Sequence, residues 1–393
     1  MKKETKAASE MAGMDCCHND KRAVLVLEDG SLFYGEGFGA LGEAHGELVF
    51  NTGMTGYVEA LTDPSYAGQI LMMTYPLIGN YGVCPEDFES DGVKIEGFVV
   101  REVCETPSNW RSEKSLPKLL EEQGVPGIQG VDTRMLTKKL RVYGAMKSTL
   151  LVYVEGEKPD IQGLIEKTRM QPSITELDVV PKVCVKKPKI IERGRRLDVV
   201  LIDCGVKLSI IRQLQNYANI ILVPYNTSAE EILSYDPDGV LISNGPGDPQ
   251  RVKETIETAR KLAGKVVLYG ICLGHQIISL ALGAKTYKLK FGHRGTNQPV
   301  KDLETGRVFI STQNHGFAVD KETLKEAGLV LTQINLNDNT VEGFKHGELP
   351  IKAVQYHPEA GPGPTTPTSS LKISLEPWRS TRKCRKERTS TKS

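Results

Sequence analysis

Three residues in the second half of the chain have the types that a nucleophilic catalytic site requires. Cys272 lies between two glycines, directly after a short apolar run. His357 and Glu359 follow a predicted strand over residues 351–356. Because Pro358 between them keeps the backbone extended, both side chains can lie on one face. A thiol nucleophile, an imidazole base and a carboxylate that orients the base are the parts of a catalytic triad.

The residues around Cys272 predict a buried strand over residues 266–269, a sharp turn, and a helix over residues 273–282. Gly270 and Gly274 lack the side chains that would obstruct a tight turn or the approach of a substrate. A thiol in the first turn of a helix lies at the positive end of the helix dipole, which favours the reactive thiolate. A lone cysteine after an apolar strand can equally be a small buried hydrophobe, and spacing alone leaves that alternative open.

Taken together, residues 270–276 and 357–359 resemble the corresponding segments of class I (triad) glutamine amidotransferases. The resemblance implies that Cys272 is the nucleophile, that His357 is the acid and base, and that Glu359 orients the imidazole.

The same resemblance implies a set of residues that bind the substrate glutamine. In the family, backbone N–H groups bind the oxyanion, and here these fall on Gly247 and Leu273. Some members carry a serine at the position of Gly53, which in this chain can offer only its backbone. His315 is a competing base on composition alone, but it lies within a binding motif and has no carboxylate beside it in the sequence. The implied glutamine-binding set is Gly53, Gly245, Gly247, Leu273, Gln276, Asn314, Gly316 and Phe317.

The overall composition excludes several classes of protein. With 50 basic and 49 acidic residues among 393, the net charge of +1 gives no general attraction to nucleic acid or to a membrane surface. The eight cysteines include no CxxC pair, and Cys16, Cys17 and His18 are too isolated to hold a metal, so we expect no metal site. No apolar run resembles a signal peptide or a membrane span. We therefore expect a cytoplasmic protein without a nucleic-acid or membrane partner.

The chain divides by pattern into an α/β protein of two domains. Residues 1–22 read as a disordered leader, and residues 23–154 alternate with period two as a β-rich domain. Residues 155–196, with four prolines and a basic run, read as a linker. In residues 197–364 strands and helices alternate, which predicts a doubly wound parallel sheet with its site at the carboxyl ends of the strands. The loop over residues 244–249 is too short for a phosphate P-loop and lacks its Lys-Ser/Thr ending.

Four polar segments in the β-rich domain extend the resemblance. Residues 51–57, 62–66, 74–82 and 130–134 are similar to segments of the carbamoyl phosphate synthetase small subunit, and the match runs from Ala23 to Pro364. The resemblance implies the glutaminase subunit of that enzyme, which hydrolyses L-glutamine through a thioester. The ammonia would go to a separate large subunit that uses ATP, Mg and bicarbonate, and this chain would hold no cofactor.

Two other functions stay open at this point. The chain could be the glutaminase of another class I amidotransferase, serving GMP, CTP or anthranilate synthesis, although the β-rich domain argues against this. It could also be a catalytically impaired subunit or scaffold, because its end is altered. By the resemblance, the carbamoyl phosphate made by the complete enzyme would feed arginine or pyrimidine synthesis.

The tail over residues 365–393 departs from the family. After Pro364 the family continues with His-Asp and an amphipathic helix, whereas here residues 365–371 have no helical period, and a basic run follows. The composition predicts a disordered tail. We favour a frameshift near codon 364 as the origin of this tail, because reading the codons of Thr365 and Thr366 one nucleotide earlier can restore His-Asp.

Overall fold

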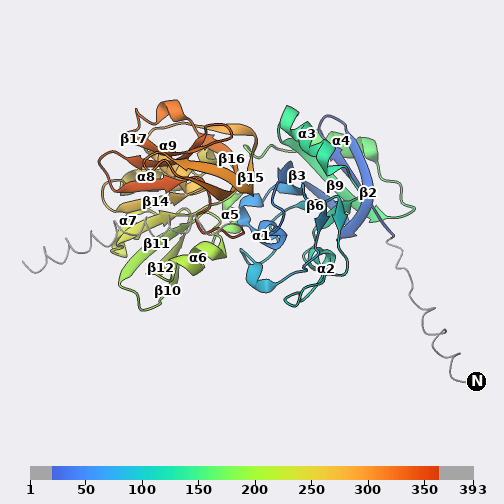
Figure 1. The fold of residues 1–393 in the computed structure, drawn as a ribbon, viewed down its shortest axis with the longest axis horizontal. Coiled ribbons are helices and arrows are strands. Elements are labelled where there is room, and N and C mark those ends of the chain that lie inside the picture. Colours follow the sequence, from blue (N-terminus) through green and yellow to red (C-terminus); the bar gives the residue numbers. More distant parts are fainter. Residues whose placement is uncertain (1–19, 363–393) are drawn as a thin grey trace, which may run out of the picture.

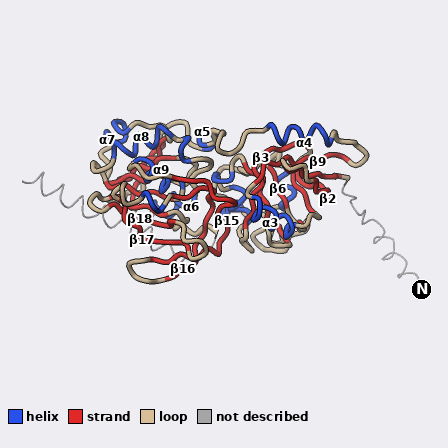
Figure 2. The backbone as a smooth tube through the Cα atoms, turned by 90° about the horizontal axis from the view of Figure 1, so that it is seen from above, coloured by secondary structure: helices blue, strands red, loops and turns tan. Residues whose placement is uncertain are grey.

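The computed structural model describes residues 20–362, which form two domains lying side by side (Figure 1). Most of the expected leader, and the tail with its frameshift hypothesis, lie outside the described residues. The first strand, β1 (Lys21–Leu27), begins two residues before the expected start at Ala23. Seen from above, the two domains lie end to end, with strands running through the interior of each (Figure 2).

The first domain is a closed barrel with the strand order β1-β2-β8-β6-β4-β3-β9. Alternate residues of β1 explain why it is buried on both sides. Its Leu25 and Leu27 join the core cluster inside the barrel, whereas Val24 and Val26 pack outward beneath a helix. The other barrel strands are β2 (Leu32–Gly39), β3 (Gly42–Asn51), β4 (Gln69–Met73), β6 (Gly97–Val99), β8 (Pro126–Gln129) and β9 (Met146–Val154).

Short helices and a two-stranded sheet surround the barrel. Helix α3 begins where the Asp132 side chain accepts a hydrogen bond from the Met135 N–H, and it ends at Gly144, whose φ is 99°. The helices are α1 (Tyr57–Thr62), α2 (Leu116–Glu122) and α3 (Thr133–Tyr143), and the small strands are β5 (Leu77–Ile78) and β7 (Glu102–Val103).

The segment expected as a linker, residues 155–196, contains regular structure. Helix α4 (Ile161–Met170) is capped by the Asp160 side chain, and its Leu164 packs against the outward face of β1. The segment also holds α5 (Val180–Val183) and β10 (Lys189–Ile191), which pairs antiparallel with β12 (Ala218–Pro224). The basic run thus includes an edge strand of the second domain.

The second domain is built on a ten-stranded sheet of order β10-β12-β11-β13-β14-β19-β18-β17-β15-β16. Its parallel part is the expected alternating unit. It comprises β12, β11 (Leu197–Asp203), β13 (Gly239–Ile242), β14 (Val267–Ile271) and β19 (Ile351–Val354), with α6 (Leu208–Leu214), α7 (Ala229–Ser234), α8 (Lys253–Leu262) and α9 (Leu273–Ala281). Helices α7, α8 and α9 pack on one face of the sheet and α6 on the other, which confirms the doubly wound α/β fold.

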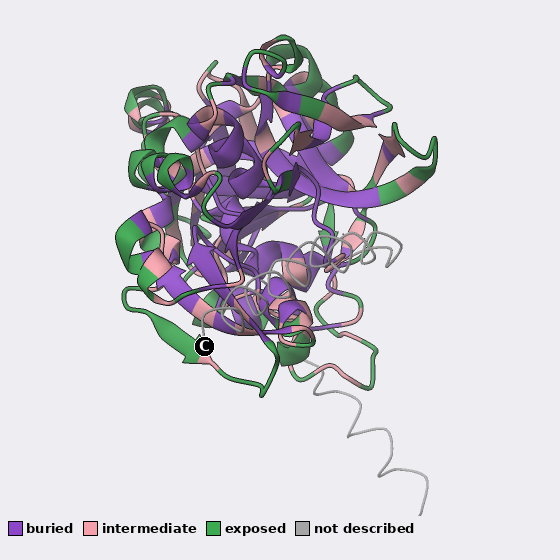
Figure 3. Ribbon diagram, turned by 90° about the vertical axis from the view of Figure 1, so that its left-hand side faces the viewer, coloured by how far each residue is buried: buried purple, intermediate pink, exposed green. Residues whose placement is uncertain are grey.

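The sheet is mixed rather than wholly parallel. Strands β15 (Thr286–Asp302), β16 (Val308–Val319), β17 (Leu329–Asn335) and β18 (Val341–His346) pair antiparallel. They follow one another through short connections without crossover helices, and such connections favour antiparallel pairing. Figure 3 shows the buried residues filling the interior of this domain. Among residues 20–362, no helix has the length and apolar run needed to cross a membrane.

Candidate active site

Cys272 occupies a strained turn between β14 and α9. Its φ of 53° and ψ of −101° lie where a residue other than glycine is rarely found. A Cβ on Gly270 would lie 2.5 Å from the Gly274 carbonyl carbon, and a Cβ on Gly274 would collide with the Ile242 carbonyl oxygen. The two glycines therefore allow the turn to pack tightly on itself and on β13, and this packing presents the thiol.

The structure brings His357 and Glu359 to the same place. The His357 N–H donates to the Thr312 carbonyl at 2.9 Å, which fixes the residue just beyond the end of β19. Its Nδ1 lies 2.6 Å from Glu359 Oε1, and both side chains are buried. The other ring nitrogen, Nε2, is buried without another hydrogen-bond partner among the described residues, which leaves it for the Cys272 thiol.

The surroundings of His357 and Glu359 shift the pKa values of the two side chains in opposite directions. Burial alone would lower the pKa of His357. The Glu359 carboxylate and the Cys272 thiol together outweigh burial, and they raise the pKa of His357 to about 10. Burial alone raises the pKa of Glu359, but Lys207 and His357 outweigh it and lower the pKa to about 2. At neutral pH the pair is therefore imidazolium and carboxylate. An imidazolium beside a thiol stabilises thiolate and can deliver a proton to a leaving group.

Lys207 is a site residue that the sequence analysis missed. Its side chain is buried, and its Nζ lies 3.0 Å from Glu359 Oε1. The available signal was position, because Lys207 follows the turn after β11 at the edge of the sheet where sites collect.

The two residues expected to supply oxyanion donors follow neighbouring parallel strands. Leu273 is the first residue of α9, so its N–H has no acceptor within the helix. Gly247 lies in the loop after β13 with φ of 84°, a conformation that glycine adopts without strain. In the same loop, the Asn244 side chain accepts from the Lys207 N–H at 3.2 Å and donates to Ser65 Oγ at 2.9 Å.

A cavity beside Cys272 has walls from both domains. Ser65 of the first domain lines it, close to the loop after β13. Ser65 belongs to the motif over residues 62–66, but the sequence indicated no role for it. The expected binding residues that line the cavity are Gly245, Gly247, Gln276, Asn314, Gly316 and Phe317.

Two residues of the expected glutamine-binding set lie outside that lining. Leu273 is one, and only its backbone was expected to act. Gly53 is the other, and its N–H donates to the Asn51 side chain at 2.6 Å within its own loop. A backbone contact from Gly53 to glutamine stays a prediction, and Ser65 lines the cavity from the first domain.

Side chains on the cavity wall are held by further hydrogen bonds. Gln276 Nε2 donates to the Phe317 carbonyl at 2.8 Å and to Gln355 Oε1 at 2.9 Å. Asn314 Nδ2 donates to Asp63 Oδ2 of the first domain at 2.8 Å. The wall of the cavity is thus ordered partly by the domain interface.

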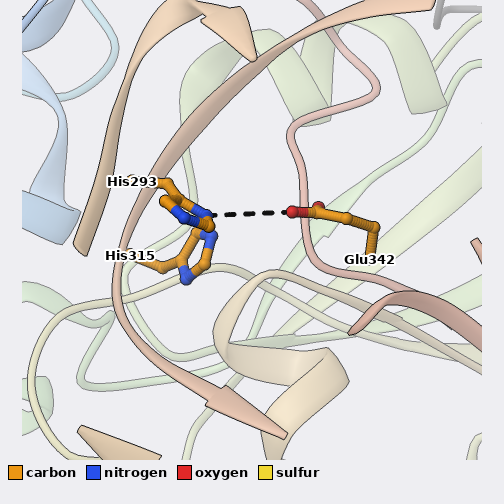
Figure 4. A group of neighbouring side chains, drawn as sticks. All are labelled: His293, His315 and Glu342. Atoms are coloured by element: carbon orange, nitrogen blue, oxygen red, sulfur yellow. Dashed lines mark ion pairs between the residues drawn. The ribbon is translucent and has the colours of Figure 1, made fainter. Parts of the chain in front are cut away.

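Figure 4 shows a second buried group, the histidine cluster, formed by His293, His315 and Glu342. His315, the competing base, has both nitrogens engaged. Its Nδ1 lies 2.7 Å from the Phe317 carbonyl and its Nε2 lies 3.0 Å from Gln313 Oε1. Burial, with the nearby His293 adding to it, lowers the pKa of His315 well below its usual range.

His293 and Glu342 complete the cluster without a close ion pair. His293 Nε2 bonds Asp338 Oδ2 at 2.8 Å, while its Nδ1 lies 3.9 Å from Glu342 Oε1. Burial raises the pKa of Glu342 to about 7. With both nitrogens of His315 engaged, the cluster offers fewer free donor atoms than the three or four protein ligands that zinc commonly takes.

Models of two known protein families match the two domains of the chain. The family model "Carbamoyl-phosphate synthase small chain, CPSase domain" matches residues 25–150, and the model "Glutamine amidotransferase class-I" matches residues 200–371. The chain is 63% identical to the carbamoyl phosphate synthase small chain of Archaeoglobus fulgidus, over 87% of this chain and 95% of the relative. Identity is 55% to the small chain of Methanopyrus kandleri and 57% to that of Methanocaldococcus jannaschii, with the same shares covered. The chain therefore belongs to the carbamoyl phosphate synthase small-chain family and carries a class I glutamine amidotransferase domain, which confirms the function expected from its sequence, the glutaminase subunit of that enzyme.

Proposed function

We propose that Cys272, His357 and Glu359 hydrolyse the side-chain amide of L-glutamine and that the ammonia passes to a separate large synthetase subunit. The observation that carries this proposal is the buried triad itself. A strained cysteine faces an imidazole that is held at 2.6 Å by a carboxylate, at the wall of a cavity lined by the residues expected to bind glutamine.

In the first half of the reaction the Cys272 thiolate attacks the amide carbon of glutamine. The carbonyl oxygen becomes an oxyanion bound by the N–H groups of Gly247 and Leu273, donors worth roughly 3 to 4 kcal/mol each. The intermediate collapses with cleavage of the carbon–nitrogen bond. The His357 imidazolium gives its proton to the leaving nitrogen, and ammonia and a thioester result.

In the second half His357, now neutral, takes a proton from water as the water oxygen attacks the thioester carbon. A second oxyanion forms at the same N–H groups, and its collapse releases glutamate and regenerates the Cys272 thiolate beside the imidazolium. Glu359 stays ionised and holds the imidazole in orientation throughout, as its lowered pKa allows.

The remaining chemistry would belong to the large subunit, with ATP, Mg and bicarbonate. Among the described residues, the loop after β13 lacks the features of a phosphate loop and lies instead at the glutamine cavity. Cys84, Cys104, Cys184, Cys204 and Cys272 are free thiols, in keeping with a reducing cytoplasm.

Glutamate release from glutamine by the purified chain tests the assignment. The wild type should hydrolyse glutamine slowly alone and faster with its large subunit, and Cys272→Ser should release none in either state. Cys104→Ser, which alters a free thiol of the barrel domain, is the matched control and should keep the wild-type rate. Unchanged release by Cys272→Ser would refute the proposed nucleophile.

A further inference from the structure

We propose that Glu89, a buried carboxylate of the barrel domain, is a positioning residue for the triad, because it holds the Lys207 ammonium beside Glu359 across the domain boundary. The inference rests on the proposed role of the triad. It makes the first domain part of the charge arrangement that sets the state of His357.

Lys207 is the link between the two carboxylates. Its Nζ lies 3.0 Å from Glu359 Oε1, the same oxygen that His357 Nδ1 approaches at 2.6 Å. The ammonium also donates to the Gly361 carbonyl, and Glu89 Oε1 lies 3.7 Å away. An ammonium has three donors, and two of them are taken by Glu359 Oε1 and the Gly361 carbonyl, while Glu89 lies at ion-pair rather than hydrogen-bond distance. The Lys207 side chain is only 2% exposed, so these buried groups rather than bulk water compensate its charge.

Glu89 is itself held firmly in place by both domains. Its N–H donates to Thr62 Oγ1 of the barrel domain at 2.9 Å. Its carbonyl accepts from the Leu208 N–H at 2.8 Å, and its Oε2 accepts from the Ser209 N–H at 2.9 Å. Because two of these bonds reach the first turn of α6, directly after Lys207, the carboxylate and the ammonium are fixed relative to each other.

Charge decides what this arrangement does to the triad. Around the Lys207 ammonium lie Glu89 and Glu359 in contact, with Asp63 acting from farther away. Glu59, a half-buried carboxyl of the barrel domain, interacts electrostatically with both Glu89 and Lys207. Lys207 lowers the pKa of His357, whereas Glu359 raises it. Without Glu89, Glu359 would be the one carboxylate in contact with the Lys207 ammonium. The ammonium would then draw Glu359 away from the His357 imidazole, and more positive charge would remain near that imidazole.

The test compares Glu89→Gln with wild type in the enzyme assembled with its large subunit. We expect kcat for glutamate release to fall about tenfold, the scale of coupling within one buried hydrogen-bond network, with a smaller change in the KM for glutamine. The alkaline limb of kcat against pH, which reports loss of the His357 proton, should move to lower pH. Glu86→Gln is the matched control, because Glu86 lies in the same segment but is exposed and pairs with Arg111 at the surface. A Glu89→Gln enzyme with the kcat, KM and pH profile of this control would overturn the inference.

A second comparison separates positioning from folding. If Glu89 acts through Lys207, adding Glu89→Gln to Lys207→Met should cost little, because no ammonium remains to be held. A further fall of about tenfold in the double variant would overturn the inference, since independent effects multiply. The double variant buries no unpaired ammonium, so this comparison decides the question even if Glu89→Gln alone does not fold. Failure of the triad assignment would appear separately, as glutaminase activity in Cys272→Ser.

Discussion

Two buried groups in the second domain each contain histidine and glutamate, but the pKa values of these residues are shifted in opposite directions. In the triad, the pKa of His357 is raised to about 10 and that of Glu359 is lowered to about 2. In the histidine cluster, the pKa of His315 lies well below its usual range and that of Glu342 is raised to about 7.

Both groups are buried, so burial does not explain the difference. In the triad the imidazole nitrogen and the carboxylate oxygen lie 2.6 Å apart, and the Lys207 ammonium favours the ionised carboxylate. In the cluster the nearest approach of His293 to Glu342 is 3.9 Å, and burial dominates both His315 and Glu342. The charge beside each imidazole, a carboxylate 2.6 Å from His357 but the His293 and Arg294 side chains near His315, decides which histidine can act as an acid at neutral pH.

The sharpest test of this contrast replaces one histidine from each group. His357→Gln should lower kcat for glutamine hydrolysis about 10²–10⁴-fold, the usual contribution of a positioned acid–base group. The loss of kcat in His315→Gln should be at least about tenfold smaller than the loss in His357→Gln, because the His315 ring transfers no proton in the proposed reaction. Steady-state glutamate release at saturating glutamine measures both. Equal losses would remove the distinction between the two groups.

The carboxylates provide the next test. Glu359→Gln keeps the shape but removes the charge that raises the pKa of His357, so we expect kcat to fall on the order of 10²-fold. Glu342→Gln should leave kcat within about twofold, because a carboxyl with a pKa of about 7 is already neutral in half of the molecules at pH 7. A large loss in Glu342→Gln would show that the cluster contributes to catalysis.

The smallest effect that we expect is a loss of folding stability at acid pH. Burial lowers the pKa of His275 to about 3, although the Gln355 side chain opposes it. Above the unfolded pKa, about 6.5, both states are neutral; as pH falls below it, the unfolded state binds the proton first and stability is lost. Between pH 7 and pH 5 this loss is on the order of 2 kcal/mol.

Replacing that histidine by a neutral side chain isolates its contribution. His275→Met should show a smaller difference in unfolding free energy between pH 7 and pH 5 than the wild type, whatever its stability at pH 7. Urea unfolding at the two pH values measures this difference. An identical acid loss in the variant would contradict a neutral buried His275.

Much of the second domain could be predicted from sequence because its signals are local. The turn at Cys272 needs glycines two residues away on either side, and His357 and Glu359 are joined by a single proline. The strands and helices of the parallel part alternate with clear periods. Even α4 had a readable start, because Asp160 precedes apolar residues at helical spacing, although proline content led to a linker prediction.

The residues that sequence reasoning missed meet only through tertiary contacts. Glu89 and Lys207 are far apart in the chain and come together at the domain boundary. Ser65 lines the cavity from the first domain, and the Asn51 side chain accepts from the Gly53 N–H; no periodicity in the sequence reports such contacts. The pairing of β15 with β16 contains register shifts, which blur the period-two pattern.

In the proposed function, Cys272 serves only to produce ammonia for a separate synthetase subunit. The direct measurement is carbamoyl phosphate synthesis by the assembled Cys272→Ser enzyme, with glutamine and with an ammonium salt as alternative nitrogen sources. Synthesis from glutamine should be abolished, while synthesis from ammonium should stay close to the wild-type rate. Equal loss with both nitrogen sources would contradict it.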